Sequence, residues 1–272
     1  MKLFDVFLIF ASLFSVAAIC PAQVSLVAHW KFDEASGATA SDFIGSFDGT
    51  LTGSASFVGG EISGNAVSLT SSVDSIVNMG SSVPGFTTGD FSIVSWIKTK
   101  ATGGDAIYAG KHLSTVSSGY FLGVNTIGGT GGGANKAVFY PSGSGSNIPF
   151  STTTVNDGEW HQVVGVYTAG GNAQIYVDGG LAEDTETSPA MAGNSVAFLI
   201  GGITVGSTPT NLYEGLVDDV QLYSSALNQS NVAYLFVNPG QTVPEPRSAV
   251  LSLLGLAVFA RRRRYTGAHW VL

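Results

Sequence analysis

The segment GEWHQVVGVYTAGGNAQIYVDG, from Gly158 to Gly179, decides the fold class of this chain. Two runs rich in β-branched and aromatic residues, WHQVVGVYT (160–168) and AQIYVD (173–178), flank a glycine- and asparagine-containing turn at 170–172. Residues that tolerate positive φ between two such runs are a strong signal for a β-hairpin. The segment therefore predicts two antiparallel strands joined by a tight turn.

Further strands are expected on both sides of this hairpin. FSIVSWIK (91–98) is apolar on both faces, which is typical of a strand in the interior of a sandwich. Residues 196–200 and 216–223 read as two more strands. One helix is expected after them, because Asn228 is a good N-cap and the residues around it have the spacing of a hydrophobic staple. The chain is thus predicted to be an all-β protein with one helix at the end of the domain.

Composition supports this class and narrows the function. The chain has 36 glycines, and only 11% of its residues are charged, which favours an all-β protein with many turns over a helical one. Between Gln23 and Val243 there are 17 acidic residues, five lysines and no arginine. Nucleic-acid binding needs clustered basic residues, so that class of function is excluded. An acidic surface suits divalent cations or neutral sugars.

Five segments in order resemble one known family. They are AHWKFDEASG (28–37), GNAVSLTSS (64–72), FTTGDFSIVSWIKT (86–99), the hairpin at 158–179 and YEGLVDDVQLYSSAL (213–227). Together they are similar to the LamG-like (laminin G type 3) branch of the concanavalin A-like lectin and glucanase fold. The resemblance implies two antiparallel sheets packed as a jelly-roll sandwich. Five aromatic residues are expected as its buried anchors: Trp30, Phe32, Trp96, Trp160 and Phe198.

The resemblance also bears on catalysis. Retaining β-glucanases of this fold carry carboxylates in an E-x-D-x-x-E pattern on one strand, which sets the nucleophile and the acid/base at the required separation. This sequence has no such motif. The nearest cluster, Glu183, Asp184 and Glu186, is interpreted as a solvated loop, and His161 of the family's W-H pair as structural. The chain is therefore expected to be non-enzymatic, with polysaccharide cleavage as the less favoured alternative.

A structural Ca²⁺ site is the one ion site that the resemblance implies. The family's C-terminal G-x-x-D-[DE]-V strand supplies an aspartate, which corresponds to Asp218. Asp33 or Glu34 is expected to supply a second oxygen and the Gly64 carbonyl a third, since hard cations prefer several oxygen ligands. The alternative is that these acidic residues lie at a strand end and bind no ion.

The expected function is that of a binding module for carbohydrate or another component of the extracellular matrix. Sugar sites use an exposed aromatic residue with a few polar groups. Four residues in turn-rich segments are the candidates: Tyr108, Lys111, Tyr140 and Tyr213. The alternative is a structural matrix or biofilm protein that needs no small ligand.

The first 22 residues read as a signal peptide. Lys2 begins a short basic region, and residues 6–19 are apolar or small. Cleavage is expected after Ala22, which leaves the mature domain, 23–240, without a cysteine. A lipoprotein signal at Cys20 is the alternative, although Ile19 is larger than such signals prefer. These features predict an exported protein.

The last segment, 241–272, reads as a sorting signal. The motif Val243, Pro244, Glu245 and Pro246 is followed by an apolar run at 248–260 and four arginines at 261–264. The prolines force an extended peptide, and the apolar run is shorter than the roughly 20 residues that span a bilayer. This order resembles the PEP-CTERM signal that an exosortase processes at the cell envelope. The tail would contact the membrane before processing, and a permanent membrane anchor is the alternative.

Overall fold

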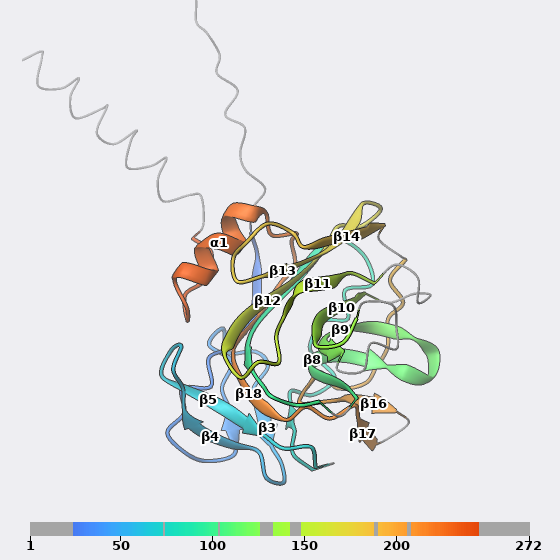
Figure 1. Ribbon diagram of the computed structural model, residues 1–272. Helices are drawn as coiled ribbons and strands as arrows, with labels where there is room; N and C mark the ends of the chain where they lie inside the picture. Colours follow the sequence, from blue (N-terminus) through green and yellow to red (C-terminus); the bar gives the residue numbers. More distant parts are fainter. Residues whose placement is uncertain are drawn as a thin grey trace, which may run out of the picture. The chain divides into compact units, whose positions relative to one another are not determined.

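A computed structural model gives the structure of the chain and describes residues 24–72, 74–102, 104–125, 133–141, 148–187, 190–205 and 208–244. Two antiparallel sheets face each other across a shared apolar core (Figure 1). The expected jelly-roll sandwich is confirmed. The predicted signal peptide, Cys20 and the tail beyond Pro244 lie outside the described residues.

The first sheet, called sheet A, has the strand order β14-β13-β12-β7-β18-β5-β4, with β1 also paired to β18. Its central strands have the bounds that the sequence predicted to within one residue, including the 91–98 strand. The strands are β1 (Leu26–Trp30), β4 (Ser56–Gly59), β5 (Asn65–Leu69), β7 (Phe91–Lys98), β12 (Trp160–Tyr167), β13 (Asn172–Val177), β14 (Asp184–Thr187) and β18 (Gly215–Tyr223).

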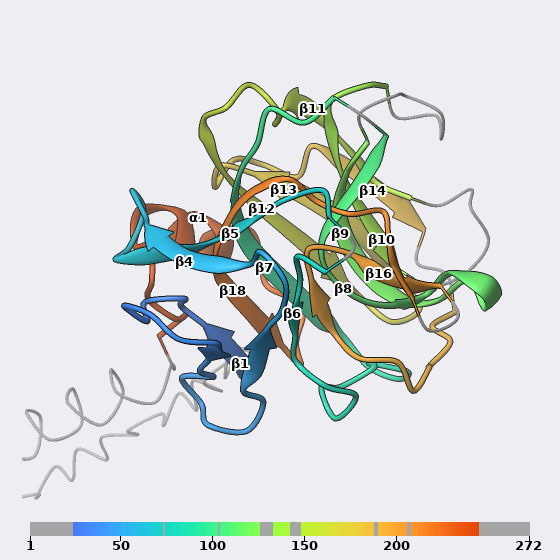
Figure 2. The same cartoon turned by 90° about the horizontal axis from the view of Figure 1, so that it is seen from below.

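The second sheet, called sheet B, has the order β11-β10-β9-β8-β15-β6-β3-β2, and β16 pairs with both β8 and β17. Figure 2 shows β8, β9 and β10 on the side of the molecule away from β4 and β5. The strands are β2 (Thr39–Ala40), β3 (Gly49–Leu51), β6 (Val77–Asn78), β8 (Asp105–Leu113), β9 (Ser118–Asn125), β10 (Lys136–Pro141), β11 (Phe150–Thr154), β15 (Leu199–Ile200), β16 (Ile203–Val205) and β17 (Thr208–Thr210). A short 3₁₀ turn, η1 (Ser114–Val116), joins β8 to β9.

The predicted helix, α1 (Gln229–Val237), is present and covers the outer face of sheet A. Its N-terminus has a reciprocal cap, because the Asn231 N–H donates to Asn228 Oδ1 (3.0 Å) and the Asn228 N–H donates to Asn231 Oδ1 (3.1 Å). Buried residues of α1 pack on residues of β7, β12 and β18. Within the described part of the chain, no helix has the length and apolar character needed to cross a membrane.

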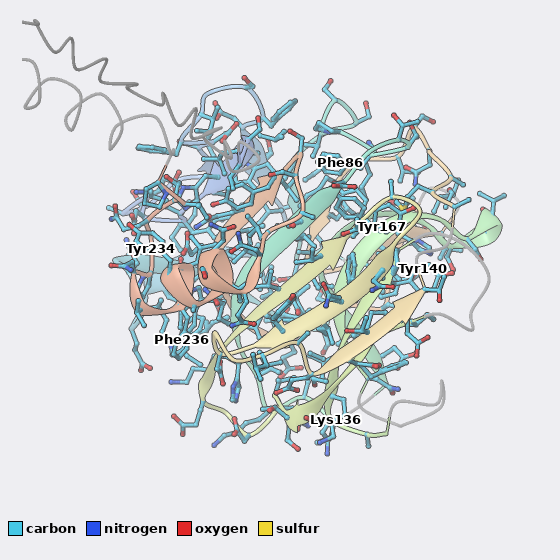
Figure 3. The ribbon with its side chains drawn as sticks, turned by 90° about the horizontal axis from the view of Figure 1, so that it is seen from above. Phe86, Lys136, Tyr140, Tyr167, Tyr234 and Phe236 are labelled. Atoms are coloured by element: carbon cyan, nitrogen blue, oxygen red, sulfur yellow. The ribbon has the colours of Figure 1, made fainter. Side chains whose placement is uncertain are left out.

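The aromatic anchors divide into two groups. Trp30, Phe32 and Phe198 are buried between the sheets as expected, and Trp30 stacks on Phe198 with ring centroids 5.4 Å apart. Trp96 is buried, but on the outer face of sheet A, where Phe236 of α1 stacks on it at 5.5 Å. Figure 3 labels Phe236 of this pair. Trp160 is only half-buried. The expectation that these two tryptophans lie inside the sandwich is therefore wrong.

His161, of the W-H pair, contacts two aspartates. Its Nδ1 lies 2.8 Å from Asp178 Oδ2, and its Nε2 lies 3.2 Å from Asp157 Oδ1. Asp178 Oδ1 also accepts a hydrogen bond from the Gln162 N–H (2.9 Å). The hydrogen bond to Asp178 raises the pKa of His161 against the opposing effect of burial. His161 thus ties the turn after β13 to the start of β12.

Two acidic residues join the edges of the two sheets. Glu183 Oε2 accepts hydrogen bonds from the N–H groups of Thr152 (2.7 Å) and Thr153 (2.9 Å), and Asp184 Oδ2 accepts one from Phe150 (3.0 Å). These donors belong to β11, the edge strand of sheet B, and β14 is the edge strand of sheet A. The interpretation of this cluster as a solvated loop is wrong for Glu183 and Asp184. Their carboxylates cover edge N–H groups that would otherwise be open to another chain.

Candidate functional site

The outer face of sheet B carries an aromatic cluster. Phe121 of β9 and Tyr140 of β10 are paired in register, and their rings are parallel, with centroids 4.8 Å apart. The ring of His112 from β8 meets both edge-on, at 5.1 Å from Phe121 and 5.0 Å from Tyr140. Both stacked residues are partly exposed. Three adjacent strands thus present one aromatic surface toward solvent.

This cluster lines a cavity of about 220 Å³, which we call the sheet B groove. Apolar side chains such as Val138, Phe150 and Ile203 form part of its wall. Polar groups enter it from Asp105, Asn125 and Asn211. An aromatic surface with a carboxylate and amides is the combination expected of a sugar site. The volume is below the roughly 300–1,000 Å³ of sites for drug-sized ligands, so the groove suits a single small polar ring.

His112 adds no positive charge to the groove at neutral pH. Burial lowers its pKa to about 4, against the opposing effect of a hydrogen bond with the backbone of Ser118. Its Nδ1 is buried and has no hydrogen-bond partner within the described part of the chain. His112 therefore contributes a neutral ring to the groove and does not attract an anion.

Of the four residues predicted for sugar binding, only Tyr140 reaches this groove. The side chains of Tyr108, Lys111 and Tyr213 are buried in the protein interior. The rings of Tyr108 and Tyr213 meet edge-on at 5.6 Å. Lys111 Nζ donates to the carbonyls of Ser81 (2.8 Å) and Val196 (2.5 Å). These three residues therefore support the fold and do not face a surface ligand.

The predicted cation ligands Asp33, Gly64 and Asp218 lie close together beside β18 of sheet A. The Asn65 N–H donates to Asp33 Oδ1 (3.1 Å), and a Cβ on Gly64 would lie only 1.9 Å from the same oxygen. Asp218 is fully buried, and its Oδ2 has no hydrogen-bond partner among the described residues. Burial, with the neighbouring charges of Asp219 and Asp33, raises the pKa of Asp218 to about 8.

These donors fit a hard cation. An orphaned buried carboxylate oxygen, a second carboxylate and a tightly packed glycine backbone are the ligand types that Ca²⁺ takes. Within the described residues, no three side chains from His, Cys, Asp and Glu gather as a metal cluster. The remaining ligands would therefore be main-chain or hydroxyl oxygens and water.

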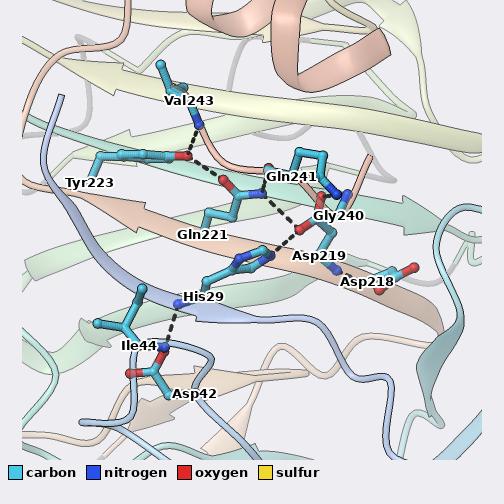
Figure 4. A network of polar contacts seen from close by, with 10 residues as sticks. All are labelled: His29, Asp42, Ile44, Asp218, Asp219, Gln221, Tyr223, Gly240, Gln241 and Val243. Atoms are coloured by element: carbon cyan, nitrogen blue, oxygen red, sulfur yellow. Dashed lines mark hydrogen bonds and ion pairs between the residues drawn. The ribbon is translucent and has the colours of Figure 1, made fainter. Parts of the chain in front are cut away.

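A buried polar network lies beside this site and holds both ends of the domain together (Figure 4). His29 Nε2 of β1 lies 2.5 Å from Asp219 Oδ1 of β18. The Gly240 N–H donates to Asp219 Oδ2 (2.8 Å), and Gln221 Nε2 donates to the Gln241 carbonyl (2.9 Å). The C-terminal segment therefore runs alongside β18, fixed by side chains of that strand.

The network continues to the first residue of the predicted sorting motif. The Val243 N–H donates to the hydroxyl of Tyr223 (3.4 Å), which itself donates to Gln221 Oε1 (2.5 Å). Val243 is only 8% exposed and belongs to the apolar cluster beneath α1. Pro244 is exposed. The first residue of the motif is thus packed in the folded domain, and the next residue is at its surface.

The two facing antiparallel sheets, the covered outer face of sheet A and the groove of sheet B define a concanavalin A-like jelly-roll domain. A family model described as "Laminin_G_3: Concanavalin A-like lectin/glucanases superfamily" matches residues 71–233. The chain belongs to this family. No curated protein sequence matches the chain at a significant level.

Solved structures with the same fold include domain 4 of AbnA, a GH43 extracellular arabinanase from Geobacillus stearothermophilus, in complex with arabinotriose. That match has a TM-score of 0.58 and 20% identity, and it covers 78% of this chain and 98% of that domain. The binding domain of Paraclostridial Mosquitocidal Protein 1 matches with a TM-score of 0.61 and 15% identity, over 78% of this chain and 52% of that one.

A Trypanosoma rangeli sialidase in complex with the inhibitor DANA has a TM-score of 0.54 and 18% identity, over 78% of this chain and 32% of the enzyme. This chain therefore spans about half of the toxin domain and a third of the sialidase. At these identities the likeness concerns the fold alone. Binding domains and an enzyme are both among the matches.

Proposed function

We propose that this chain is an exported, non-enzymatic binding module of the cell envelope or extracellular matrix, and that its sheet B groove holds a neutral sugar. The observation that carries the proposal is the Phe121–Tyr140 stack with His112 at the wall of a small cavity. Sugar rings bind to aromatic faces and to a few convergent polar groups, and both are present. The similar arabinanase domain, solved with arabinotriose, is consistent with this proposal.

A binding role rather than a catalytic one is supported by the carboxylates. The sequence lacks the E-x-D-x-x-E pattern of retaining glucanases. Glu183 and Asp184, the nearest cluster, accept hydrogen bonds from N–H groups of β11. The groove contains one acidic side chain, Asp105, among its lining residues, whereas the usual glycosidase mechanism needs two.

Replacing Tyr140 with alanine should weaken glycan binding at least tenfold, because the stacked aromatic surface is lost. Glycan-array screening of the mature domain, followed by titration with the best neutral oligosaccharide, provides the measurement. Phe43→Ala is the matched control, since Phe43 is 65% exposed and does not line the groove. An array with no neutral hits would favour the structural matrix protein instead, and turnover of β-glucans would contradict the non-enzymatic role.

We also propose that the chain is sorted through its C-terminal tail by an exosortase-type enzyme. Support comes from the order of the VPEP motif, apolar run and arginine block. The burial of Val243 beside the exposed Pro244 would place the processing enzyme directly against the folded domain.

Replacing residues 244–246 with three alanines should therefore leave unprocessed protein in the membrane fraction of the native host. Mass spectrometry of the termini and fractionation measure this outcome. Replacing Thr242 alone with alanine would serve as a control that preserves the motif and the hydrogen bonds of Gly240 and Gln241. Unchanged processing and distribution of the 244–246 variant would contradict the sorting signal.

Calcium is proposed as a structural ion held by Asp33, Asp218 and the Gly64 carbonyl. When bound, it would neutralise the buried Asp218 carboxylate and join the segment after β1 to β18. Its expected effect is on stability and not on catalysis.

A further inference from the structure

A second and larger cavity lies at the rim of the sandwich, where β7 ends and β18 begins. Its volume is about 760 Å³, and Lys98, Thr99, Lys100, Glu214 and Leu216 contribute to its wall. This volume is within the roughly 300–1,000 Å³ of sites that hold small molecules. The two cavities share one lining residue, Ala106, and the lysines and Glu214 line the rim cavity alone.

The wall of the rim cavity has two lysines and one glutamate, in a domain that is strongly acidic elsewhere. It contains two of the five lysines found between Gln23 and Val243. Lys98 Nζ is paired with Glu61 Oε2 at 2.7 Å. Lys100 is exposed, and no described residue forms an ion pair or hydrogen bond with its ammonium group. Lys100 is therefore the cation available to a ligand.

The side chain of Lys100 is held in place by a glycine. Gly158 has φ +88°, and a Cβ at this position would lie 2.0 Å from Lys100 Cε. The lysine stem thus crosses the bare backbone of Gly158, where any larger residue would displace it. Stem packing of this kind leaves the ammonium at the surface while reducing the freedom of the chain.

Trp160 does not line the rim cavity itself, but it lies beside Lys98, which does. Trp160, Lys98 and Leu216 are register partners across β12, β7 and β18, so their side chains share one face of sheet A. Trp160 Nε1 donates to Glu61 Oε2 (3.1 Å), the same oxygen that pairs with Lys98. The hydrogen bond and charge of Lys98 lower the pKa of Glu61. One ionised carboxylate therefore fixes the indole edge and the Lys98 ammonium together.

The hydroxyl and carboxylate groups of the wall limit the kind of anion that fits. Glu214 Oε2 accepts a hydrogen bond from the Ser71 hydroxyl (3.0 Å), and the Thr99 hydroxyl donates to the Glu214 carbonyl (2.6 Å). A fixed negative charge in the wall disfavours a multiply charged group such as phosphate. A singly charged carboxylate on a polyhydroxylated ring matches one free ammonium, polar walls and an indole face.

We propose that the rim cavity binds an acidic saccharide, with the sugar carboxylate on Lys100 and the ring against Trp160. The residues proposed to bind this sugar differ from those proposed for the neutral sugar in the sheet B groove. A chain of alternating or mixed neutral and acidic sugars would therefore find two different sites on the same domain.

Titration of the purified chain with oligogalacturonate, and with its methyl-esterified and therefore neutral form, tests this proposal. The acidic form should bind at least tenfold more tightly than the ester. Lys100→Gln should remove this preference, whereas Lys31→Gln, which makes the same change in charge outside the cavity, should retain it. Trp160→Phe should keep binding, and Trp160→Ala should weaken both forms.

Competition and variant experiments distinguish a saccharide site from a simple anion site. Acetate at the same carboxylate concentration should not compete, because it lacks the ring; effective competition would mean a simple anion site and overturn the proposal. Equal affinity for the two forms, an unaffected Lys100→Gln variant or no binding at millimolar ligand would also overturn it. Tyr140→Ala should leave oligogalacturonate binding intact, so failure of the groove proposal and failure of this one are distinguishable.

Discussion

Replacing Phe91 with alanine should lower the free energy of unfolding by about 3–5 kcal/mol, the range for truncation of a core aromatic residue. Phe91 is fully buried and lies at the centre of an aromatic cluster that spans both sheets. Its ring centroid is 4.9 Å from those of Phe86 and Tyr120 and 5.2 Å from that of Tyr167. Figure 3 labels Phe86 and Tyr167 of this cluster. A loss of this size is a large part of the roughly 5–15 kcal/mol that stabilises a typical domain.

Denaturant titration monitored by circular dichroism measures this change. Phe43→Ala should cost no more than about 0.5 kcal/mol, because it removes an aromatic ring that is 65% exposed. Trp160→Ala should cost less than Phe91→Ala, since the indole is half-buried outside the sandwich. A Phe91→Ala midpoint equal to that of the parent would contradict the placement of this ring between the sheets.

Without calcium, the domain should lose stability as the pH rises from about 4 to about 8, because Asp218 is buried. The pKa of Asp218 is raised to about 8 in the folded state from 3.8, so the folded chain holds a proton that the unfolded chain releases. The loss of folding stability is complete above pH 8 and is on the order of 5 kcal/mol. The proposed calcium ion would bind the ionised form and should restore about 2.7 kcal/mol of this loss at a hundredfold excess over Kd.

Thermal melts at pH 5 and pH 8, with chelator and with added calcium, measure these effects. Asp218→Asn should raise the pH 8 melting temperature in chelator and remove the response to calcium. Glu159→Gln, which neutralises an exposed carboxylate, should change neither. Magnesium should substitute poorly, because it demands octahedral geometry. If neither chelator nor calcium changed the melting temperature of the parent protein, the proposed ion site would be wrong. The description of the fold would not be affected.

The strands and the helix were predictable because their signals are local. The Asn228 cap, the apolar run at 91–98 and the turn residues between the two runs of the hairpin act over a few positions, and the structure has elements at these places. Trp160 was misplaced for a related reason. A strand such as β12 has two apolar faces, and the sequence does not say which face meets the other sheet and which meets α1 or solvent.

The binding surface was less accessible to sequence reasoning. Pairing between β8 and β9 shifts register between Ile107 and Ala109, and this irregularity reverses the alternation along β8. Tyr108 and Lys111 consequently point inward and His112 outward. His112 and Phe121 were not predicted as site residues. Their contact with Tyr140 depends on the order of three strands, β8, β9 and β10, which no local pattern in the sequence specifies.

Contacts between distant segments could also not be predicted from the sequence. His29 and Asp219 meet across 190 positions of the chain because β1 pairs with β18. The aspartate pair at 218–219 suggested cation ligands, but only the structure divides their roles. Asp218 faces the Asp33 side, and Asp219 receives hydrogen bonds from Gln221 and Gly240.

The course of the C-terminal segment has a mechanical consequence. Gly240, Gln241 and Val243 bond in that order to Asp219, Gln221 and Tyr223, so the segment runs parallel to β18. A force on Pro244 directed along β18 would load these three bonds simultaneously, in shear, and not peel them apart one after another. Rupture then needs all three to fail together while Val243 leaves its apolar contacts. A domain tethered at this point would bear tension through its central strand before any of its loops were stretched.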